Sequence, residues 1–186
     1  MKKGLSRSVN HGFTLIEFLV TLAVMSILTA VAAPQLSALG ESAQMRVLNN
    51  DLLDHIRLAR SEAILRGGRV VICTASSTAT CSTSTGWHQG WLVFVDTNNN
   101  GKLDIGERPL RHRPPAPSGW TMNSSSTISR YVSYDALGSA RMLSGAFQAG
   151  TVTICRTGSS RTKPRQVIIN SVGRSRSQDA PSNACG

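Results

Sequence analysis

The sequence predicts an α+β fold in which one long N-terminal helix packs on an antiparallel β-sheet. A run of 21 mostly apolar residues, 13–33, is the first observation behind this prediction. Apolar residues then recur at helical spacing as far as Ala63, and every strand-like run comes after Gly67-Gly68. A helix followed only by strands is the order of an α+β protein rather than of alternating α/β units.

The apolar run 13–33 has the length of a membrane-spanning helix, because as a helix it would extend about 32 Å. It is preceded by the basic residues Lys2, Lys3 and Arg7. These charges predict a cytoplasmic N-terminus, a single crossing and export of the remainder. The alternative is an ordinary secretory signal peptide, whose apolar core would be shorter. Its small-residue cleavage site has a loose counterpart in Ala30, Ala32 and Ala33.

Glu17 is the only charged residue inside the apolar run. An acid at the centre of a membrane helix costs about 2.5–3.5 kcal/mol on insertion scales, so its presence asks for an explanation. One explanation is an acid near a helix N-terminus, where the helix dipole favours negative charge. The other is a functional role within the membrane.

The segment 34–66 is predicted to continue the helix with an amphipathic character. Its apolar residues lie three or four positions apart, so they form one stripe that can pack on a sheet. The stripe consists of Met45, Leu48, Leu52, Ile56, Ala59 and Ala63. Gly67-Gly68 supplies the stop signal, and flexibility is expected at Pro34 and Gly40.

The remaining segment, 67–186, is predicted to be a β-rich domain. β-Branched and aromatic residues concentrate in five short runs that turn-rich segments separate. The runs are Arg69–Cys73, Trp91–Val95, Arg130–Tyr134, Thr151–Cys155 and Gln166–Asn170. The proline-rich segment 109–118 is predicted to be a loop.

Four cysteines follow the apolar run, and export would place them in an oxidising compartment. Three pairings are possible. The preferred pairing is local, with Cys73–Cys81 closing a Ser/Thr-rich loop and Cys155–Cys185 tying the C-terminal tail to a strand. A metal site is disfavoured, because the sequence has no CxxC motif and no His near these cysteines.

Basic residues are distributed unevenly along the chain. The sequence has 20 Lys and Arg against 10 Asp and Glu, and after residue 107 these counts are 11 and 2. This excess predicts a cationic C-terminal surface suited to a polyanion, either nucleic acid or anionic lipid. Alternatively, the basic residues are spread over several faces and serve solubility.

The segment 96–107 fits the spacing of an EF-hand calcium loop. Its oxygen donors would be the Lys102 carbonyl and the side chains of Asp96, Asn98, Asn100, Asp104 and Glu107. A strand-like run precedes the segment where an EF-hand has a helix, and Asn and Gly also suit a tight hairpin. A structural hairpin is therefore favoured, and no metal or other cofactor is predicted.

The sequence offers no catalytic constellation. Its four histidines are His11, His55, His88 and His112. The motifs G-x-S-x-G and HExxH and a phosphate-binding glycine loop are all missing. The sequence therefore predicts that the protein is not an enzyme.

The start of the apolar run, Gly12-Phe13-Thr14-Leu15-Ile16-Glu17, resembles the type III signal of type IV pilins and type II secretion pseudopilins. The resemblance implies that a prepilin peptidase cuts between Gly12 and Phe13, removes the leader 1–12 and methylates the new amine on Phe13. It also implies that Glu17 neutralises the N-terminal amine of a neighbouring subunit, which explains an acid kept in lipid.

The same resemblance implies a location. Residues 13–33 would anchor the protein in the inner membrane, and the domain 67–186 would be periplasmic before the subunit enters a pilus or pseudopilus. Pro34 matches the helix-bending proline of these proteins.

The central part of the chain resembles the GspH/FimT family of minor pilins and pseudopilins. The matching residues are Gly86-Trp87-His88-Gln89-Gly90-Trp91-Leu92-Val93-Phe94-Val95-Asp96, then Asn98, Asn100-Gly101, Asp104, Glu107 and Leu110-Arg111. This resemblance implies the type IV pilin fold, with other pilins or pseudopilins as partners in a filament.

Near the C-terminus, Gly173-Arg174-Ser175-Arg176 resembles the GRxR motif of FimT-type minor pilins. The resemblance implies binding of double-stranded DNA during natural transformation, with Arg174 and Arg176 contacting the DNA. Other relatives serve filament priming, so a purely structural minor pilin or secretion pseudopilin is the alternative.

The chemistry of the motif agrees with contact to a DNA backbone. Two arginines at i and i+2 of an extended segment face the same way, and each guanidinium can grip phosphate oxygens. Gly173 permits a tight turn. Because no aromatic residue follows Phe147, stacking on single strands is disfavoured and duplex DNA is the expected ligand. Four more basic residues are expected to widen the patch: Arg156, Arg161, Lys163 and Arg165. An exposed basic turn without a ligand is the alternative.

Overall fold

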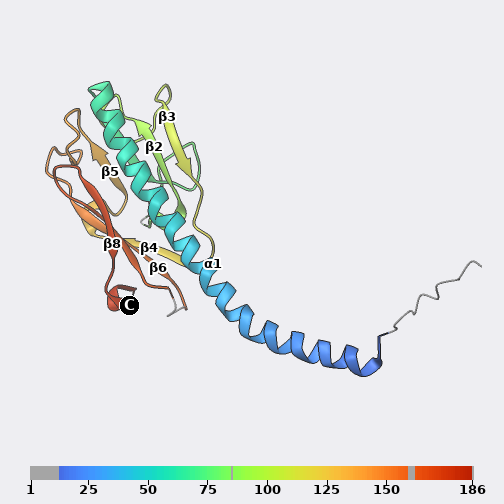
Figure 1. Cartoon of the computed structure of the whole chain (residues 1–186). Helices are drawn as coiled ribbons and strands as arrows, with labels where there is room; N and C mark the ends of the chain where they lie inside the picture. The colour runs from blue at the N-terminus through green and yellow to red at the C-terminus, as the bar shows by residue number, and fades with distance from the viewer. Residues whose placement is uncertain (1–12, 85, 159–161, 186) are drawn as a thin grey trace, which may run out of the picture. The chain divides into compact units, whose positions relative to one another are not determined.

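The computed structural model describes residues 13–84, 86–158 and 162–185 of the chain (Figure 1). The predicted leader 1–12, with Gly12 of the cleavage site, lies outside the described residues, and so does Arg161. The chain divides into two compact units between Gly40 and Glu41.

The helix α1, Leu15–Arg66, begins within the signal-like motif and continues through both Pro34 and Gly40. Its segment Leu15–Ala32 has a mean hydropathy of 2.3 and is long and apolar enough to cross a membrane. Hydroxyl groups in this segment donate to backbone carbonyls of the preceding turn. The pairs are Thr21 with Phe18, Ser26 with Ala23, and Thr29 with Met25. These bonds satisfy hydroxyls that a lipid surrounding would leave without a partner.

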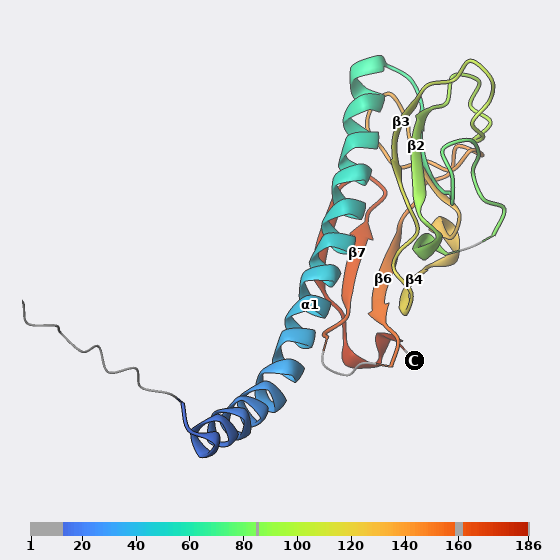
Figure 2. The same ribbon diagram turned by 90° about the vertical axis from the view of Figure 1, so that its right-hand side faces the viewer.

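In the described part of the chain, eight strands follow α1 and form two four-stranded antiparallel sheets, where the sequence predicts a single sheet (Figures 1 and 2). The strand orders are β3-β2-β1-β5 and β4-β6-β7-β8. The strands are β1 Val70–Thr74, β2 Trp91–Val95, β3 Pro109–Arg113, β4 Trp120–Ser124, β5 Tyr131–Tyr134, β6 Gly150–Arg156, β7 Arg165–Ile169 and β8 Ser175–Asp179. Short 3₁₀ helices are η1 Trp87–Gln89, η2 Ser126–Ile128 and η3 Ser182–Cys185. The predicted α+β class is confirmed.

Three of the strands are not predicted by the sequence, namely β3, β4 and β8, and all three are edge strands. The prediction of a loop over 109–118 is wrong for Pro109–Arg113, which forms β3. Pro109 has no amide hydrogen to donate, but at the first position of an edge strand that donor is not needed. Polar residues dominate β8, so its sequence lacks the β-branched pattern that marks a buried strand.

The main core lies between the second half of α1 and both sheets. The predicted apolar stripe of α1, from Met45 to Ala63, is buried throughout and packs on Trp91 of β2, Met122 of β4 and Ile154 of β6. Burying each large aliphatic side chain contributes roughly 1.5–3 kcal/mol. The whole core and both disulfides fall within Glu41–Gly186. This unit therefore carries everything needed to fold without the membrane segment.

The first sheet is also covered on its other face. Val71, Leu92 and Phe94 are fully buried there beneath Leu103 and a disulfide-closed loop. The disulfides are Cys73–Cys81 and Cys155–Cys185, which is the pairing expected from the sequence. Cover on both faces explains why β1 is apolar at nearly every position instead of alternating.

A histidine takes part in the contact between α1 and the first sheet. Trp91 Nε1 donates a hydrogen bond of 2.7 Å to His55 Nδ1. The Arg113 guanidinium lies 5.2 Å from the Trp91 ring centroid and pairs with Asp51 at 3.3 Å. Burial, the largest influence, lowers the pKa of His55 below 6.5. The folded state thus holds a neutral imidazole whose Nδ1 accepts a hydrogen bond.

We expect His55 to make stability fall as the pH drops below 6.5. Below pH 6.5 the His55 side chain of the unfolded chain binds a proton, whereas in the folded state it stays neutral because its pKa is lower. Protonation therefore favours unfolding until the pH passes below the pKa of His55 in the folded state. The melting temperature of residues 35–186 should therefore fall more between pH 7.5 and 5.5 in the wild type than in His55→Gln, whose amide can accept from Trp91 without titrating. His112→Gln on β3 is the control, and an identical pH profile for the wild type and His55→Gln would contradict this expectation.

Candidate nucleic-acid interface

The turn between β7 and β8 positions the GRxR motif. The Asn170 amide donates to the Arg174 carbonyl at 3.1 Å, and the Gly173 amide donates to the Asn170 carbonyl at 2.9 Å. The Asn170 side chain accepts from the Arg174 amide at 2.8 Å. These three bonds close the turn and fix the backbone of Arg174, while its side chain stays exposed.

Gly173 is the residue of this turn that no other amino acid can replace without strain. Its φ is +80°, a conformation that L residues with a side chain rarely adopt. A Cβ at this position would also clash with the Gly138 carbonyl oxygen and lie 3.0 Å from the Tyr134 ring. The glycine therefore lets the turn pack directly on the backbone of a neighbouring turn.

Gly173→Ala is expected to lower the free energy of unfolding by about 2–4 kcal/mol, because it combines backbone strain with overpacking. Gly106→Ala is a matched control, since Gly106 has a φ of +94° and an added Cβ there would meet nothing within 4 Å. The control should show only the strain, roughly 1 kcal/mol. Urea unfolding of residues 35–186 measures both values, and equal losses would refute the role of the Gly138 contact.

Arg60 of α1 holds this turn in place. Its Nε donates to the Gly138 carbonyl at 2.9 Å and its guanidinium donates to the Val172 carbonyl at 3.3 Å. One side chain thus joins the helix to two turns distant in sequence. Sequence reasoning did not find this role, because Arg60 looks like one of several polar residues beside the apolar stripe.

Arg176 lies on the face of β8 that points away from α1, where a row of polar side chains crosses the sheet. Its guanidinium donates to Gln178 Oε1 at 2.7 Å. Gln178 donates to Gln166 of β7 at 3.5 Å, and Gln166 donates to Thr153 of β6 at 3.3 Å. We call these four residues the polar ladder. The ladder limits the positions that the Arg176 guanidinium can take.

Arg174 and Arg176 keep their charges available. Both side chains are exposed, and within the described part of the chain neither forms a salt bridge. Gly173, Arg174 and Arg176 thus lie on one braced turn and the start of β8, but Arg174 borders α1 whereas Arg176 lies on the opposite face of the sheet, so the expectation that the two arginines share one face is not met.

The basic residues expected to widen this patch lie elsewhere. Arg165 pairs with Asp179 at the far end of β7, four residues or about 13 Å along the strand from the turn. Lys163 precedes Arg165 at that same end. Arg156 pairs with Glu41 at 3.5 Å and lies over the Trp120 ring. The expectation is therefore corrected: Arg156, Lys163 and Arg165 do not join Arg174, because antiparallel pairing carries them to the opposite end of the sheet.

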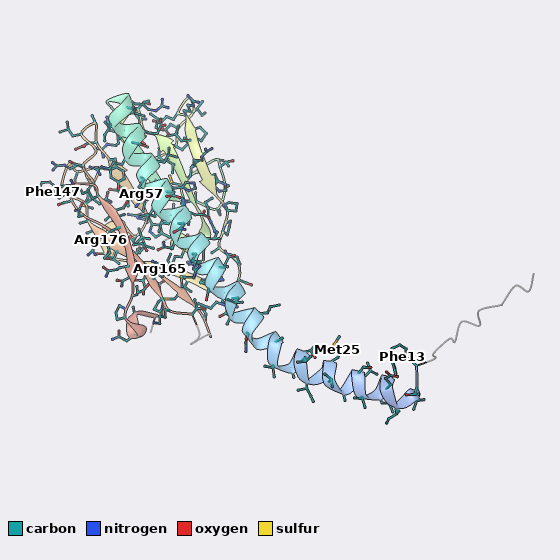
Figure 3. The ribbon with its side chains drawn as sticks, in the orientation of Figure 1. Phe13, Met25, Arg57, Phe147, Arg165 and Arg176 are labelled. Atoms are coloured by element: carbon teal, nitrogen blue, oxygen red, sulfur yellow. A yellow bond between two sulfur atoms is a disulfide. The ribbon has the colours of Figure 1, made fainter. Side chains whose placement is uncertain are left out.

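Phe13, proposed for processing, lies just before α1, and Glu17, proposed for assembly, lies in its first turn. Phe13 is 83% exposed, and the Glu17 amide donates to the Thr14 hydroxyl at 3.3 Å (Figure 3). The Glu17 side chain is exposed and makes no hydrogen bond or ion pair with other described residues. Its carboxylate is thus available to a partner.

The calcium-like segment forms the loop between β2 and β3. Asp96 accepts from the amides of Asn100 and Gly101, and burial, the largest influence, raises the pKa of Asp96. Asn98 and Asn100 both donate to Asp104, which lowers the pKa of Asp104. Glu107 accepts from two amides of the same loop, those of Thr97 and Asp104. These bonds describe a hairpin loop that its own side chains organise.

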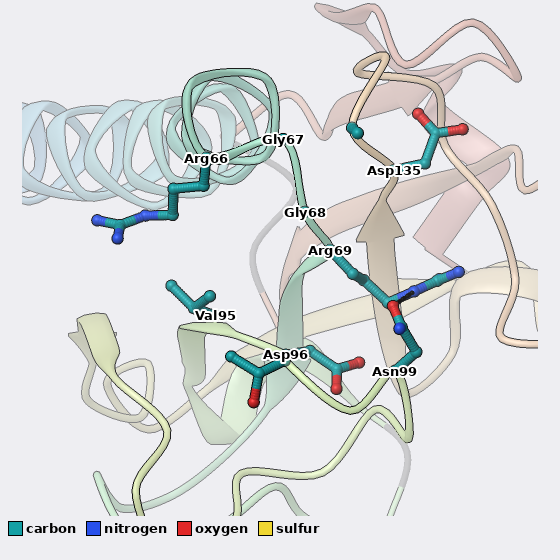
Figure 4. A pocket seen from close by; sticks show the side chains of 10 residues that line it. Arg66, Gly67, Gly68, Arg69, Val95, Asp96, Asn99 and Asp135 are labelled. Atoms are coloured by element: carbon teal, nitrogen blue, oxygen red, sulfur yellow. Dashed lines mark hydrogen bonds between the residues drawn. The ribbon is translucent and has the colours of Figure 1, made fainter.

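A hollow of about 500 Å³ lies where α1 ends (Figure 4). Several of its polar groups have partners inside or beside the hollow. Arg69 donates to Asn99 at 3.0 Å and to Ser133 at 2.8 Å, and Asp135 pairs with Arg141 at 3.5 Å. This hollow mixes both signs of charge, in contrast to the turn that bears Arg174.

Comparison with known proteins gives two matches to family models. Residues 49–173 match the type II transport protein GspH, and residues 7–33 match the prokaryotic N-terminal methylation motif. Comparison with curated proteins finds no match.

Among solved structures, the type IV minor pilin FimU of Pseudomonas aeruginosa is similar with a TM-score of 0.55 and 22% identity, over 76% of this chain and 92% of FimU. Two structures of the minor pseudopilin EpsH from the type 2 secretion system of Vibrio cholerae are also similar. One has a TM-score of 0.52 and 12% identity, over 73% of this chain and 97% of EpsH. The other has a TM-score of 0.51 and 10% identity, over 74% and 97%.

The GspH match spans more than half of the chain, and the solved structures share its fold over about three quarters of its length. The methylation motif coincides with the start of the apolar helix. The chain therefore belongs to the GspH family and is a type IV minor pilin or pseudopilin, a membrane-anchored component of a pilus or pseudopilus.

Proposed function

We propose that this minor pilin binds double-stranded DNA through Arg174 and Arg176, and that it serves DNA uptake in natural transformation. The observation that carries the proposal is a pair of exposed arginines, without salt bridges among the described residues, on a turn braced by Arg60. Guanidinium groups bind phosphate oxygens with two parallel hydrogen bonds, and preorganised side chains lose less entropy when they do so.

The proposal includes how the subunit is made. A prepilin peptidase cuts between Gly12 and Phe13 and methylates Phe13. Residues 13–33 hold the protein in the inner membrane with the domain 67–186 in the periplasm. On assembly, Glu17 pairs with the N-terminal amine of another pilin. The match to the methylation motif over residues 7–33 supports this sequence of events.

The test measures the binding of residues 35–186 to a labelled DNA duplex by fluorescence anisotropy over a range of salt concentrations. Contact with phosphates predicts that affinity falls steeply with salt. In a plot of the logarithm of the binding constant against the logarithm of the salt concentration, the slope should be about −0.9 for each phosphate neutralised. Equal binding to unrelated duplex sequences is expected, since phosphate contacts carry no sequence information. An absence of binding even at low salt would overturn the proposal.

A second candidate is a purely structural minor pilin or secretion pseudopilin that primes filament assembly. The likeness in fold to the pseudopilin EpsH favours it. This candidate predicts filaments that depend on the subunit and DNA uptake that does not depend on Arg174. Deleting the gene and restoring it with Arg174→Gln separates the two, because only the DNA-binding role fails in the restored strain while filaments return.

A further inference from the structure

A groove runs between α1 and the β7–β8 turn, and Arg174 forms one of its walls. It has a volume of about 460 Å³. Arg57, Arg60 and Ser61 line it from α1, and Arg174 and Ser175 line it from the turn and β8. The groove therefore brings together arginines from two segments that lie more than a hundred positions apart in the sequence.

The charge of this groove has one sign. Three arginines line it, and none of its described lining residues is a carboxylate. Ser61 and Ser175 add hydroxyl groups, which can donate to a ligand oxygen. Such a set of donors suits an oxyanion with several oxygens, and guanidinium pairs are the usual recognition of phosphate.

The three arginines are not equivalent. The guanidinium of Arg60 already donates to the Gly138 and Val172 carbonyls, so Arg60 acts as a positioning residue. Among the described residues, Arg57 forms an ion pair of 3.7 Å with Asp54, in which the two side chains are 59% and 69% exposed. Exposed pairs of this kind contribute little to stability, so Arg57 can exchange Asp54 for a ligand at small cost.

We infer that this groove binds one phosphodiester group of duplex DNA, held by Arg57 from α1 and Arg174 from the turn. The inference rests on the proposed function and extends its site onto α1 (Figure 3). Arg176 does not line the groove, because its side chain points to the face of β8 away from α1. β8 is an edge strand, and a duplex presents one phosphate for about every 1.7 Å of its axis, so a duplex that crosses this edge offers separate phosphates to Arg176 and to the groove.

The test compares Arg57→Gln with Arg165→Gln in residues 35–186. The two variants remove the same charge, and each breaks one long ion pair, 3.7 Å to Asp54 or 3.8 Å to Asp179. Arg57→Gln is expected to weaken binding to a labelled duplex roughly 3- to 10-fold and to reduce the steepness of the salt dependence by about 0.9. Arg165→Gln should change neither value beyond the small effect of lower net charge, and circular dichroism checks that both variants fold.

The outcomes separate this inference from the proposed function. One outcome is that the wild type binds the duplex and Arg174→Gln weakens this binding, but Arg57→Gln binds as well as Arg165→Gln. In that case the groove is not a phosphate site, although the proposed function stands. If the wild type does not bind the duplex at low salt, both the proposed function and this inference are wrong. The same phosphodiester group occurs in anionic lipid, so vesicles of phosphatidylglycerol form a second arm. Tighter binding to these vesicles than to the duplex, with the same loss in Arg57→Gln, would overturn the assignment to DNA.

Discussion

The double variant Arg174→Gln/Arg176→Gln is expected to bind duplex DNA about 100-fold more weakly than the wild type at low salt, while its fold stays intact. Each arginine would supply a charge-assisted contact with phosphate of about 1.5 kcal/mol, and two such losses give a factor of this size. The salt dependence should become less steep by about 1.8, because two phosphates are no longer neutralised. Fluorescence anisotropy with a labelled duplex measures both effects.

Two observations make the double variant a clean test. Both side chains are exposed, and within the described residues neither takes part in a salt bridge, so their loss leaves no charge unpaired. Arg130→Gln/Arg165→Gln is the matched control, because it lowers the net charge by the same amount at distant positions. If the control weakens binding as much as the test variant, general electrostatic attraction rather than this site is responsible.

Glu17→Gln is expected to exclude the subunit from filaments while leaving it in the membrane. Removing the carboxylate eases insertion, by about 2.5–3.5 kcal/mol at most, because an acid in lipid is costly. Assembly should suffer the opposite effect, since the amine of the neighbouring subunit would then be buried without a partner, which costs about 3–5 kcal/mol. The amount of subunit in sheared filaments, relative to the membrane fraction, should fall at least about 100-fold.

The opposite signs of these two effects make the prediction specific. Glu62→Gln is the control on the same helix, where the acid pairs with Arg66 instead. Mass spectrometry of the mature N-terminus must show that cleavage before Phe13 still occurs, since an uncleaved precursor would also stay out of filaments. Normal incorporation of cleaved Glu17→Gln would disprove the pairing of Glu17 with an amine.

The elements that the sequence predicts are those whose residues bury a periodic apolar face. The stripe from Met45 to Ala63 defines α1, and the runs that become β1 and β2 are apolar because both of their faces are covered. The edge strands β3 and β8 lack such an apolar pattern. Each has a neighbouring strand on one side alone, and most of its residues are polar. Local composition therefore predicts the interior of the two sheets better than their margins.

The candidate site follows a similar division. The GRxR motif is contiguous, so the sequence alone places Gly173, Arg174 and Arg176 together. Arg57 and Arg60 reach the same turn only because α1 packs beside β8, a contact between segments more than a hundred residues apart. Conversely, Arg165 is close to Arg174 in sequence but lies five register positions, or about 16 Å, away along β7. Proximity in sequence is a poor guide to a charged surface built on antiparallel strands.

The position of β8 at the margin of its sheet bears on self-association as well as on ligand binding. An edge strand offers unpaired backbone groups that another copy can join. Charged residues along an edge oppose such pairing, and β8 carries both Arg176 and Asp179. The residues that present charge to a polyanion thus also protect the strand from aggregation, so replacing them with apolar residues would damage solubility as well as binding.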